Sequence, residues 1–226
     1  VNFRIGRDVV EALRETARCL QTTLYIVLAC AYQVHLAHYY RSDDCVIVSP
    51  WHNRPHPDVD PVTGCFVNLL ILRATQRDNP TFAELAARAN AAMKDALQNP
   101  IPASWVIRLM GLGTHGVVPS TFLLFYQDYG SFSDIRFDGT DATHTHDLDD
   151  SYLAHCNCEL HPSKKHGHIT VKCDYGSAAI PPAAAQQFCA SFLRVLTVLA
   201  QHQQEQHAEH EPAAAQLRVR DIQAVL

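Results

Sequence analysis

The sequence feature that most constrains the fold is a run over residues 24–40 that is apolar on almost every side. A surface helix carries a broad polar face, so a run of this kind predicts a helix buried on most of its faces, at the centre of a hydrophobic core. A polar turn at residues 41–44 ends the run. Residues 45–49 are then continuously apolar and partly β-branched, which predicts a short buried strand.

The rest of the chain alternates strand and helix patterns. The predicted elements are strands over residues 1–6, 45–49, 64–73, 121–126, 152–159 and 168–175, and helices over residues 7–20, 24–40, 81–98 and 183–201. Thr81 and Glu84 have the spacing of a capping box, which marks a helix start. This order predicts an α/β fold, with helices packed against a mixed β-sheet.

Three segments do not fit regular elements. Residues 50–61 are interrupted by prolines and predict a long loop, and long ordered loops are often functional. Residues 128–150 are rich in Gly, Ser, Thr, Asp and His and predict a polar excursion. We interpret residues 213–226 as a linker or as a strap over another element.

Composition excludes several classes of function. The 226 residues carry a formal charge of −5 without a basic run, so nucleic acid is not an expected partner. The longest apolar stretch, residues 24–31, is far shorter than the roughly 20 residues of a membrane span, so no membrane association is expected. Most of the eight cysteines lie in apolar runs, where a free thiol acts as a small hydrophobic side chain. We therefore expect a reduced, cytoplasmic protein.

Residues 23–73 resemble the C-terminal lobe of the condensation domains of nonribosomal peptide synthetases. The strongest match is Thr63-Gly64-Cys65-Phe66-Val67-Asn68, closed by Arg73, which resembles the Ile-Gly-x-Phe-Val-Asn motif of that family. Weaker matches follow in the family's order: residues 98–99, Pro119 with residues 122–127, the closing helix, and residues 217–226, which resemble the segment leading to an adenylation domain. The resemblance covers nearly the whole chain.

The resemblance implies a lobe of the chloramphenicol-acetyltransferase-like fold over residues 1–210. Within that lobe it implies a floor loop at about residues 50–63, bridging two lobes, and a latch-like segment at about residues 128–150. Residues 211–226 would be a linker-like tail.

The resemblance also implies a function for the whole domain. Family members join an upstream acyl or peptidyl thioester to the amine of a downstream aminoacyl thioester. The phosphopantetheine arms of peptidyl carrier proteins are then substrates, and no directly bound cofactor is implied. An adjacent adenylation domain is a further implied partner. Amide formation is expected, with ester formation as a possible variant.

The family's catalytic motif, His-His-x-x-x-Asp-Gly in the N-terminal lobe, does not occur in this chain. His144 and His146 with Asp150 have a different spacing and a different place. We therefore assign no catalytic residue here and expect the chain to be inactive alone. Its main expected partner is an N-terminal lobe, in the same chain or in trans. Two alternatives remain: a non-catalytic module that binds a carrier protein or docks to a partner, and half of a coenzyme A-dependent acyltransferase.

The resemblance places candidate substrate-binding residues at the end of one strand, in the floor loop and along the next strand. They are Ser49, Trp51, Asn53, Arg54, Phe66, Asn68 and Tyr126. Ser49 would face the acceptor side. Asn53 and Arg54 have an alternative role in bonding to the loop's own carbonyls. We expect Asn68 to bond to the floor loop, because an unpaired buried amide costs about 1–3 kcal/mol. Phe66 and Tyr126 would be core or tunnel wall, and large apolar side chains favour core.

Two other groups of residues contain types that can bind metal or act as nucleophiles. Cys156, Cys158, His161, His166 and His168 contain zinc-ligand residue types, but Cys-x-Cys is not the usual zinc spacing, so no metal site is assigned. A nucleophilic Cys65 is disfavoured as well, because nothing in the sequence around it predicts the exposed, electropositive surroundings of a reactive thiol.

Overall fold

The computed structural model describes residues 1–102, 105, 108–109, 122–127, 157–177, 180–205 and 216–226. The elements, in chain order, are β1 (Asn2–Ile5), α1 (Arg7–Cys19), α2 (Leu24–Tyr40), β2 (Asp44–Trp51), the 3-10 turn η1 (Pro57–Val59), β3 (Asn68–Thr75), α3 (Phe82–Gln98), β4 (Phe122–Tyr126), β5 (Asn157–Pro162), β6 (Ile169–Asp174), α5 (Pro182–Glu205) and α7 (Val219–Gln223). The predicted latch-like segment, the motif-like His144 and His146, Cys156 and the predicted boundary near residue 210 lie outside the described residues.

The described strands form one six-stranded mixed sheet in the order β1-β6-β5-β4-β2-β3. The pairs β2–β4 and β4–β5 are parallel, and the other neighbours are antiparallel. Residues Leu70, Leu72 and Ala74 of β3 are buried, whereas Ile71, between them, is 40% exposed. One face of β3 therefore packs in the core. This arrangement confirms the predicted α/β class with a mixed sheet.

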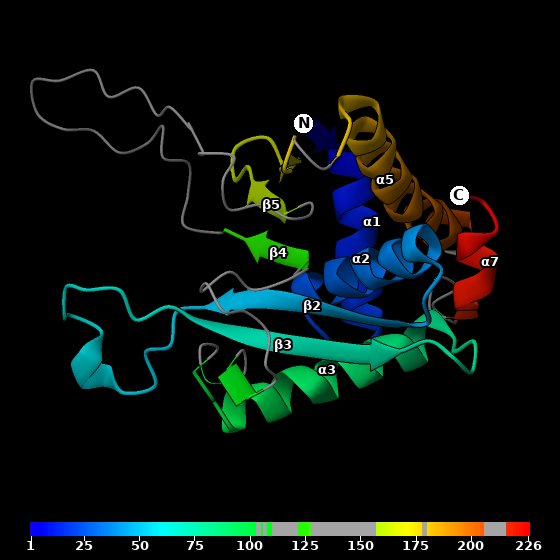
Figure 1. Cartoon of the computed structure of the whole chain (residues 1–226). Helices are drawn as coiled ribbons and strands as arrows, with labels where there is room; N and C mark the ends of the chain where they lie inside the picture. The colour runs from blue at the N-terminus through cyan, green and yellow to red at the C-terminus, as the bar shows by residue number, and fades with distance from the viewer. Residues whose placement is uncertain (103–104, 106–107, 110–121, 128–156, 178–179, 206–215) are drawn as a thin grey trace, which may run out of the picture.

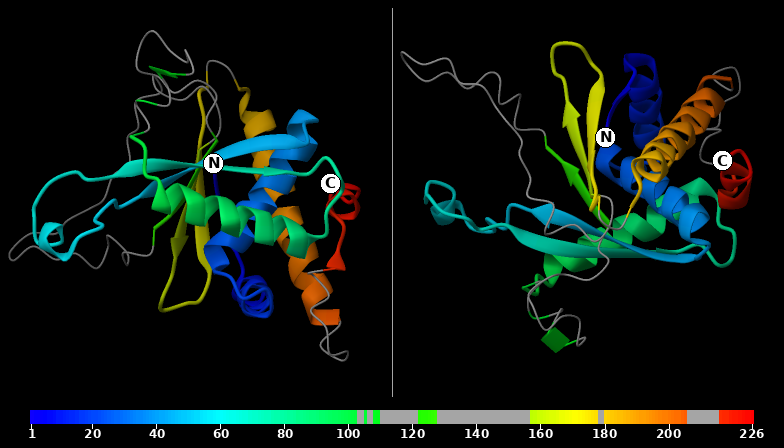
Figure 2. Two further views of the ribbon diagram at one scale, coloured as in Figure 1. Left: turned by 90° about the horizontal axis from the view of Figure 1, so that it is seen from below. Right: turned by 45° about the horizontal axis from the view of Figure 1, so that its top comes forward.

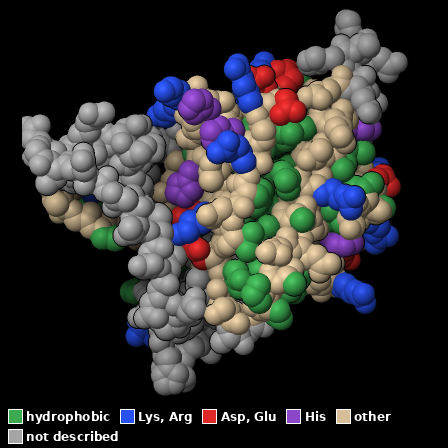
Figure 3. All heavy atoms as spheres, turned by 90° about the horizontal axis from the view of Figure 1, so that it is seen from above, with side chains coloured by type: hydrophobic (Ala, Val, Ile, Leu, Met, Phe, Trp, Pro, Cys, Tyr) green, Lys and Arg blue, Asp and Glu red, His purple; other side chains and the backbone are tan. Residues whose placement is uncertain are grey.

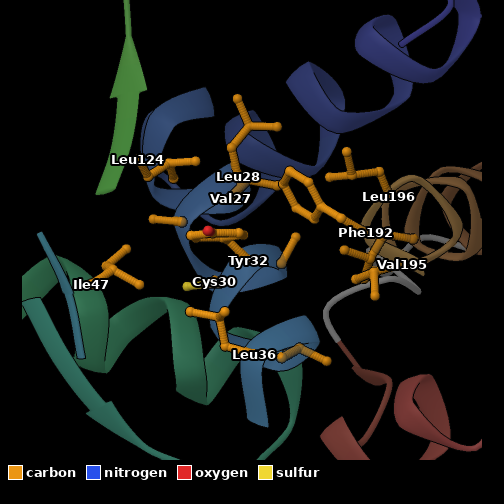
Figure 4. Packing of buried hydrophobic residues seen from close by; sticks show 14 of the residues in the cluster. Val27, Leu28, Cys30, Tyr32, Leu36, Ile47, Leu124, Phe192, Val195 and Leu196 are labelled. Carbon is orange, nitrogen blue, oxygen red and sulfur yellow. The ribbon is translucent and has the colours of Figure 1, made fainter. Parts of the chain in front are cut away.

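Helix α2 lies at the centre of the molecule, as its apolar run predicts (Figure 1). It contacts β2, α1, α3, α5 and α7. The ring of Tyr32 lies 5.1 Å from that of Phe192 on α5, and in Figure 4 Leu124 of β4 lies on the opposite side of Tyr32. Thr23 caps the helix by accepting a hydrogen bond from the Ile26 nitrogen at 3.3 Å. Burial from several elements stabilises this helix more than its own propensity does.

A polar residue inside α2 connects the helix to the β2–β3 hairpin. The buried Gln33 side chain donates to the Leu72 carbonyl at 3.3 Å and to the Cys45 carbonyl at 3.5 Å. A buried amide needs such partners, because leaving it unpaired would destabilise the fold. The register of the hairpin against α2 is therefore fixed by polar bonds as well as by apolar packing.

The predicted bounds of the hairpin were wrong at two places. Strand β2 continues through Pro50 to Trp51, which pairs with Asn68 at the start of β3. We expected β3 to begin at residue 64, but residues 64–67 form no ladder, and Val67 is 57% exposed. The floor loop therefore spans residues 52–67, and it projects away from the helices in the views of Figures 1 and 2.

The last elements close the core from another side. Helix α5 has the length and apolar composition of a candidate membrane span, but Phe188, Phe192 and Leu199 are buried against the core, as in the central helix of a globular domain. In the C-terminal segment, Val219 and Ile222 of α7 are buried in the same core. The described end of the chain thus packs over α2 and α5, as in the strap interpretation.

Candidate functional site

Two of the predicted site residues meet at one edge of the sheet. Strands β2 and β4 are parallel neighbours, with Ile47 opposite Phe122, so their carboxyl ends lie at the same edge. Ser49 and Tyr126 stand near these two ends. In open α/β sheets, ligands bind at the carboxyl ends of the strands. Ser49 is 5% exposed and Tyr126 is partly buried against the core, so both side chains are largely shielded from solvent at this edge.

Sequence reasoning missed a third member of this group, Tyr25 in the first turn of α2. Its ring lies 6.5 Å from the ring of Tyr126. Its hydroxyl is buried, and no partner among the described residues meets hydrogen-bond geometry with it. Burial raises the pKa of Tyr25 to about 12, and the neighbouring Ser49 side chain partly opposes this rise. Tyr25 therefore keeps its proton at neutral pH. We call Tyr25, Ser49 and Tyr126 the strand-end group.

An unpartnered hydroxyl in a buried position is costly, because its lost hydration is not replaced. Such a group offers a donor to any ligand that reaches it. The signal in the sequence was only one tyrosine within an apolar run, and nothing local distinguishes it from a core residue. Its position follows from the packing of α2 on β2 and from the contact of its ring with Tyr126 of β4.

Other predicted site residues hold the floor loop together. The Arg54 guanidinium donates to the carbonyls of Val59, Val62 and Gly64, the last two at 3.0 and 3.2 Å. It also lies over the ring of Phe66, 4.3 Å from the ring centroid. In the structure Arg54 therefore bonds to its own loop, which is the alternative role given above. Phe66 stacks on Arg54 and does not pack in the core.

The remaining predicted residues lie where the hairpin opens into the loop. Trp51 and Asn68 face each other as the last pair of the ladder. The Asn68 amide donates to the Ile101 carbonyl at 3.1 Å, so one bond of this side chain reaches the segment after α3. Asn53 adopts the left-handed backbone region, with φ of 51°. Among the seven predicted residues, Ser49 and Tyr126 thus lie near strand ends, and Trp51, Asn53, Arg54, Phe66 and Asn68 lie in or beside the floor loop.

Arg73, which closes the motif, is a structural residue. Its guanidinium donates to both carboxylate oxygens of Asp44 across the hairpin, at 2.7 and 2.5 Å. The Arg73 guanidinium holds the pKa of Asp44 below its usual range. Arg77 also pairs with Asp44, at 3.4 Å. These residues line a surface pocket together with Thr75, Asp78 and Arg88. This pairing fixes the base of the hairpin.

The histidine and cysteine residues that we weighed as a zinc site are dispersed. Cys158 is buried in the core, whereas His161 pairs with Glu159 at 3.2 Å. His166 and His168 stack with ring centroids 5.8 Å apart, and histidines gather on the face seen in Figure 3. The described residues hold no group of three potential metal ligands.

The cysteines do not all behave as predicted. The predicted burial is confirmed for Cys30, Cys45, Cys173 and Cys189. It fails for Cys19 and Cys65, which are exposed. Cys65 lies in the floor loop, just before β3, so an apolar run did not imply burial there. A run of apolar letters predicts burial only when a second element covers it.

Comparison with known proteins places this geometry in a family. The family model for the condensation domain matches residues 1–215. Gramicidin S synthase 2 from Brevibacillus brevis is 27% identical over 199 residues, which is 86% of this chain and 4% of the synthase. Chondramide synthase from Chondromyces crocatus is 35% identical over 97 residues, 43% of this chain and 2% of that protein.

Solved structures agree with the fold. The first condensation domain of the calcium-dependent antibiotic synthetase, in complex with a substrate analogue, has a TM-score of 0.73 at 17% identity, over 98% of this chain and 47% of that one. The fold is therefore the expected chloramphenicol-acetyltransferase-like α/β fold, and the chain spans about half the length of this relative. Because the family model matches nearly all of its residues, the chain belongs to the condensation domain family.

Proposed function

We propose that this chain is the C-terminal lobe of a condensation site that forms an amide bond in nonribosomal peptide synthesis. The observation that carries the proposal is the pair of coverages: the likeness extends over 98% of this chain but only 47% of a solved condensation domain. The absence of a His-His-x-x-x-Asp-Gly motif from the sequence supports assigning the chain to the half without it. The lobe is inactive alone in this proposal.

The substrates are two thioesters on the phosphopantetheine arms of peptidyl carrier proteins. The upstream acyl or peptidyl group passes to the amine of the downstream aminoacyl group, and an adenylation domain works beside them in the cytoplasm. The condensation step gains most from holding amine and thioester in attack geometry. This lobe supplies one wall of the site, and the motif-bearing lobe supplies the other.

The strand-end group positions the acceptor. The Tyr25 hydroxyl has no partner among the described residues, and Ser49 lies beside it with a hydroxyl that both donates and accepts. Hydrogen bonds from these hydroxyls to the acceptor arm or amine would satisfy Tyr25 and orient the nucleophile. Tyr25 and Ser49 are positioning residues here, since the proton chemistry belongs to the other lobe.

The floor loop has a separate role in the proposal. It projects from the β2–β3 hairpin, and Arg54 holds its backbone in one shape (Figure 2). A loop fixed in this way can bridge to a second lobe without a large entropic cost on docking. Trp51, Asn53, Phe66 and Asn68 would then line the tunnel between lobes near this bridge.

Reconstitution tests the proposal. The chain is combined with an N-terminal lobe that bears the His-His motif, and both carrier-bound substrates are added. We expect an amide product, detected by mass spectrometry after thioester cleavage, and no product from either lobe alone or from a pair in which the motif is replaced by alanines. A reconstituted pair that binds carrier protein but makes no product would support the non-catalytic docking module instead.

Variants of the strand-end group refine the test. Tyr25→Phe and Ser49→Ala remove one hydroxyl each, and each should lower product formation about 5- to 10-fold, as expected for one lost hydrogen bond, chiefly by raising KM for the acceptor. Ser49→Thr keeps the hydroxyl and should restore turnover. Tyr39→Phe, on the half-exposed end of α2, is the matched control and should leave turnover unchanged. Unchanged turnover in Ser49→Ala would refute its positioning role.

A further inference from the structure

Two cysteines face each other across the β5–β6 ladder. Cys158 and Cys173 are register partners, 15 positions apart in sequence, and their Sγ atoms lie 2.8 Å apart. This is well inside the roughly 3.5–4 Å at which non-bonded heavy atoms make their best contacts. Neither cysteine is in a disulfide in the structure, and both side chains are buried. The pair stands outside the strand-end group and the floor loop.

The backbone hydrogen bonds around this pair place the two cysteines in a type of ladder pair whose usual Cα separation suits a disulfide. The Val1 nitrogen donates to the Cys173 carbonyl at 2.8 Å, and the Cys173 nitrogen donates to the Val1 carbonyl at 2.7 Å. Both backbone groups of Cys173 therefore point to the β1 side. Toward β5, Cys158 and Cys173 form a non-hydrogen-bonded antiparallel pair, in which Cα atoms lie about 4.5 Å apart. That separation is within the range of about 4.4–6.8 Å found in disulfides.

A third thiol provides an internal comparison. Cys189 of α5 contacts Cys173 from the helix layer, and this contact, followed by burial, raises the pKa of the Cys189 thiol. Cys189 is therefore less able than a thiol of ordinary pKa to react as a thiolate. Cys158 and Cys173 also lie on strands whose register holds them opposite each other, whereas Cys189 approaches from a separate helix. The ladder geometry favours the cross-strand pair.

We propose that Cys158 and Cys173 form a cross-strand disulfide when the chain meets a low-molecular-weight disulfide oxidant. In the first step one thiolate attacks a sulfur of the oxidant, forming a mixed disulfide and releasing one oxidant thiol. The second cysteine thiolate then displaces the remaining half of the oxidant. Both protein thiols lose their protons, one protein S–S bond forms, and the oxidant is reduced to two thiols.

The bond would join the two strands beside the proposed acceptor site. Cys158 is the register partner of Leu124 on β4, and β4 carries Tyr126. Cross-linking β5 to β6 stiffens the support of that strand. Because both sulfurs are buried, the oxidant reaches them when the hairpin opens or while the chain folds, so the folded reduced protein should react slowly.

The experiment refolds reduced protein from guanidinium chloride with excess oxidised glutathione, then blocks the remaining thiols by alkylation. We expect a peptide joining Cys158 to Cys173, and two fewer alkylated cysteines than in a sample refolded with dithiothreitol. The oxidised protein should unfold at a higher urea concentration, and dithiothreitol should reverse that shift. This readout needs no substitution, so it does not depend on whether a variant folds.

Three variants identify the sulfurs. Cys158→Ser should abolish both the linked peptide and the urea shift. Cys189→Ser and Cys156→Ser should keep them, and the latter also separates Cys158 from its near neighbour in the same peptide. Glutathione adducts without an internal link, or a link that runs mainly from Cys173 to Cys189, would overturn the proposal.

Discussion

A buried histidine should make the stability of this chain strongly dependent on pH. His35 of α2 is fully buried, and neither of its ring nitrogens has a partner among the described residues. The rings of Phe188 and Phe192 lie 4.2 and 5.7 Å from it. Burial, aided by the nearby His38, lowers the pKa of His35 to about 3. The folded protein therefore keeps this imidazole neutral well into the acid range.

The size of the effect follows from proton linkage. The unfolded chain binds a proton at His35 below its ordinary pKa of 6.5, and the folded chain does so only near pH 3. Stability is therefore intact above pH 6.5 and is lost progressively as the pH falls toward 3. This residue alone should lower the free energy of unfolding by about 1.4 kcal/mol near pH 5.5 and by about 2.7 kcal/mol near pH 4.5.

Urea denaturation at a series of pH values measures this loss. His35→Leu replaces the imidazole by an apolar side chain of similar size and so removes the titrating group. The free energy of unfolding of this variant should therefore fall less steeply with acid than that of the original chain. His166→Gln, at an exposed position, is the matched control and should retain the original slope. Identical slopes in the original chain and in His35→Leu would refute the reasoning.

Four further substitutions test a helix cap, the core packing and the floor loop. Thr81→Ala removes the capping box at the start of α3 and should lower the free energy of unfolding by about 1 kcal/mol in urea denaturation. Phe192→Ala empties a fully buried position and should cost about 3–5 kcal/mol, whereas Leu109→Ala, at a residue 81% exposed, should change stability by less than about 0.5 kcal/mol. Arg54→Ala should leave global stability within about 1 kcal/mol but increase the rate of limited proteolysis in the floor loop, because the loop carbonyls lose their donor.

Each of these expectations has a contrary outcome. Thr81→Ser keeps the cap, so a loss equal to that of Thr81→Ala would mean that the hydroxyl is not what stabilises α3. Equal costs for Phe192→Ala and Leu109→Ala would contradict the packing of α5 against α2. An unchanged cleavage pattern in Arg54→Ala would show that the loop does not need its arginine.

Local features were predicted well from the sequence. The apolar run at 24–40 predicted α2 with its bounds, and the capping box of Thr81 and Glu84 predicted the start of α3. These features depend on residues three or four positions apart, so the local pattern carries the information. The predicted start of β3 at residue 64 was wrong, because a strand also needs a neighbouring strand with which to pair. Cys65 and Phe66 have strand-like neighbours in sequence, but the ladder with β2 begins only at Asn68.

The candidate site also combines features that follow from local sequence with features that depend on tertiary contacts. The sequence by itself determined the helix and strand types, the central position of α2 and the resemblance to a condensation domain, because these depend on composition, period and linear order. Only the tertiary structure brought Tyr25 beside Ser49 and Tyr126 and set the register that places Cys158 opposite Cys173. These contacts depend on sheet order and helix packing between distant segments, and hydrophobic patterning specifies that a side chain is buried but not which side chain it meets.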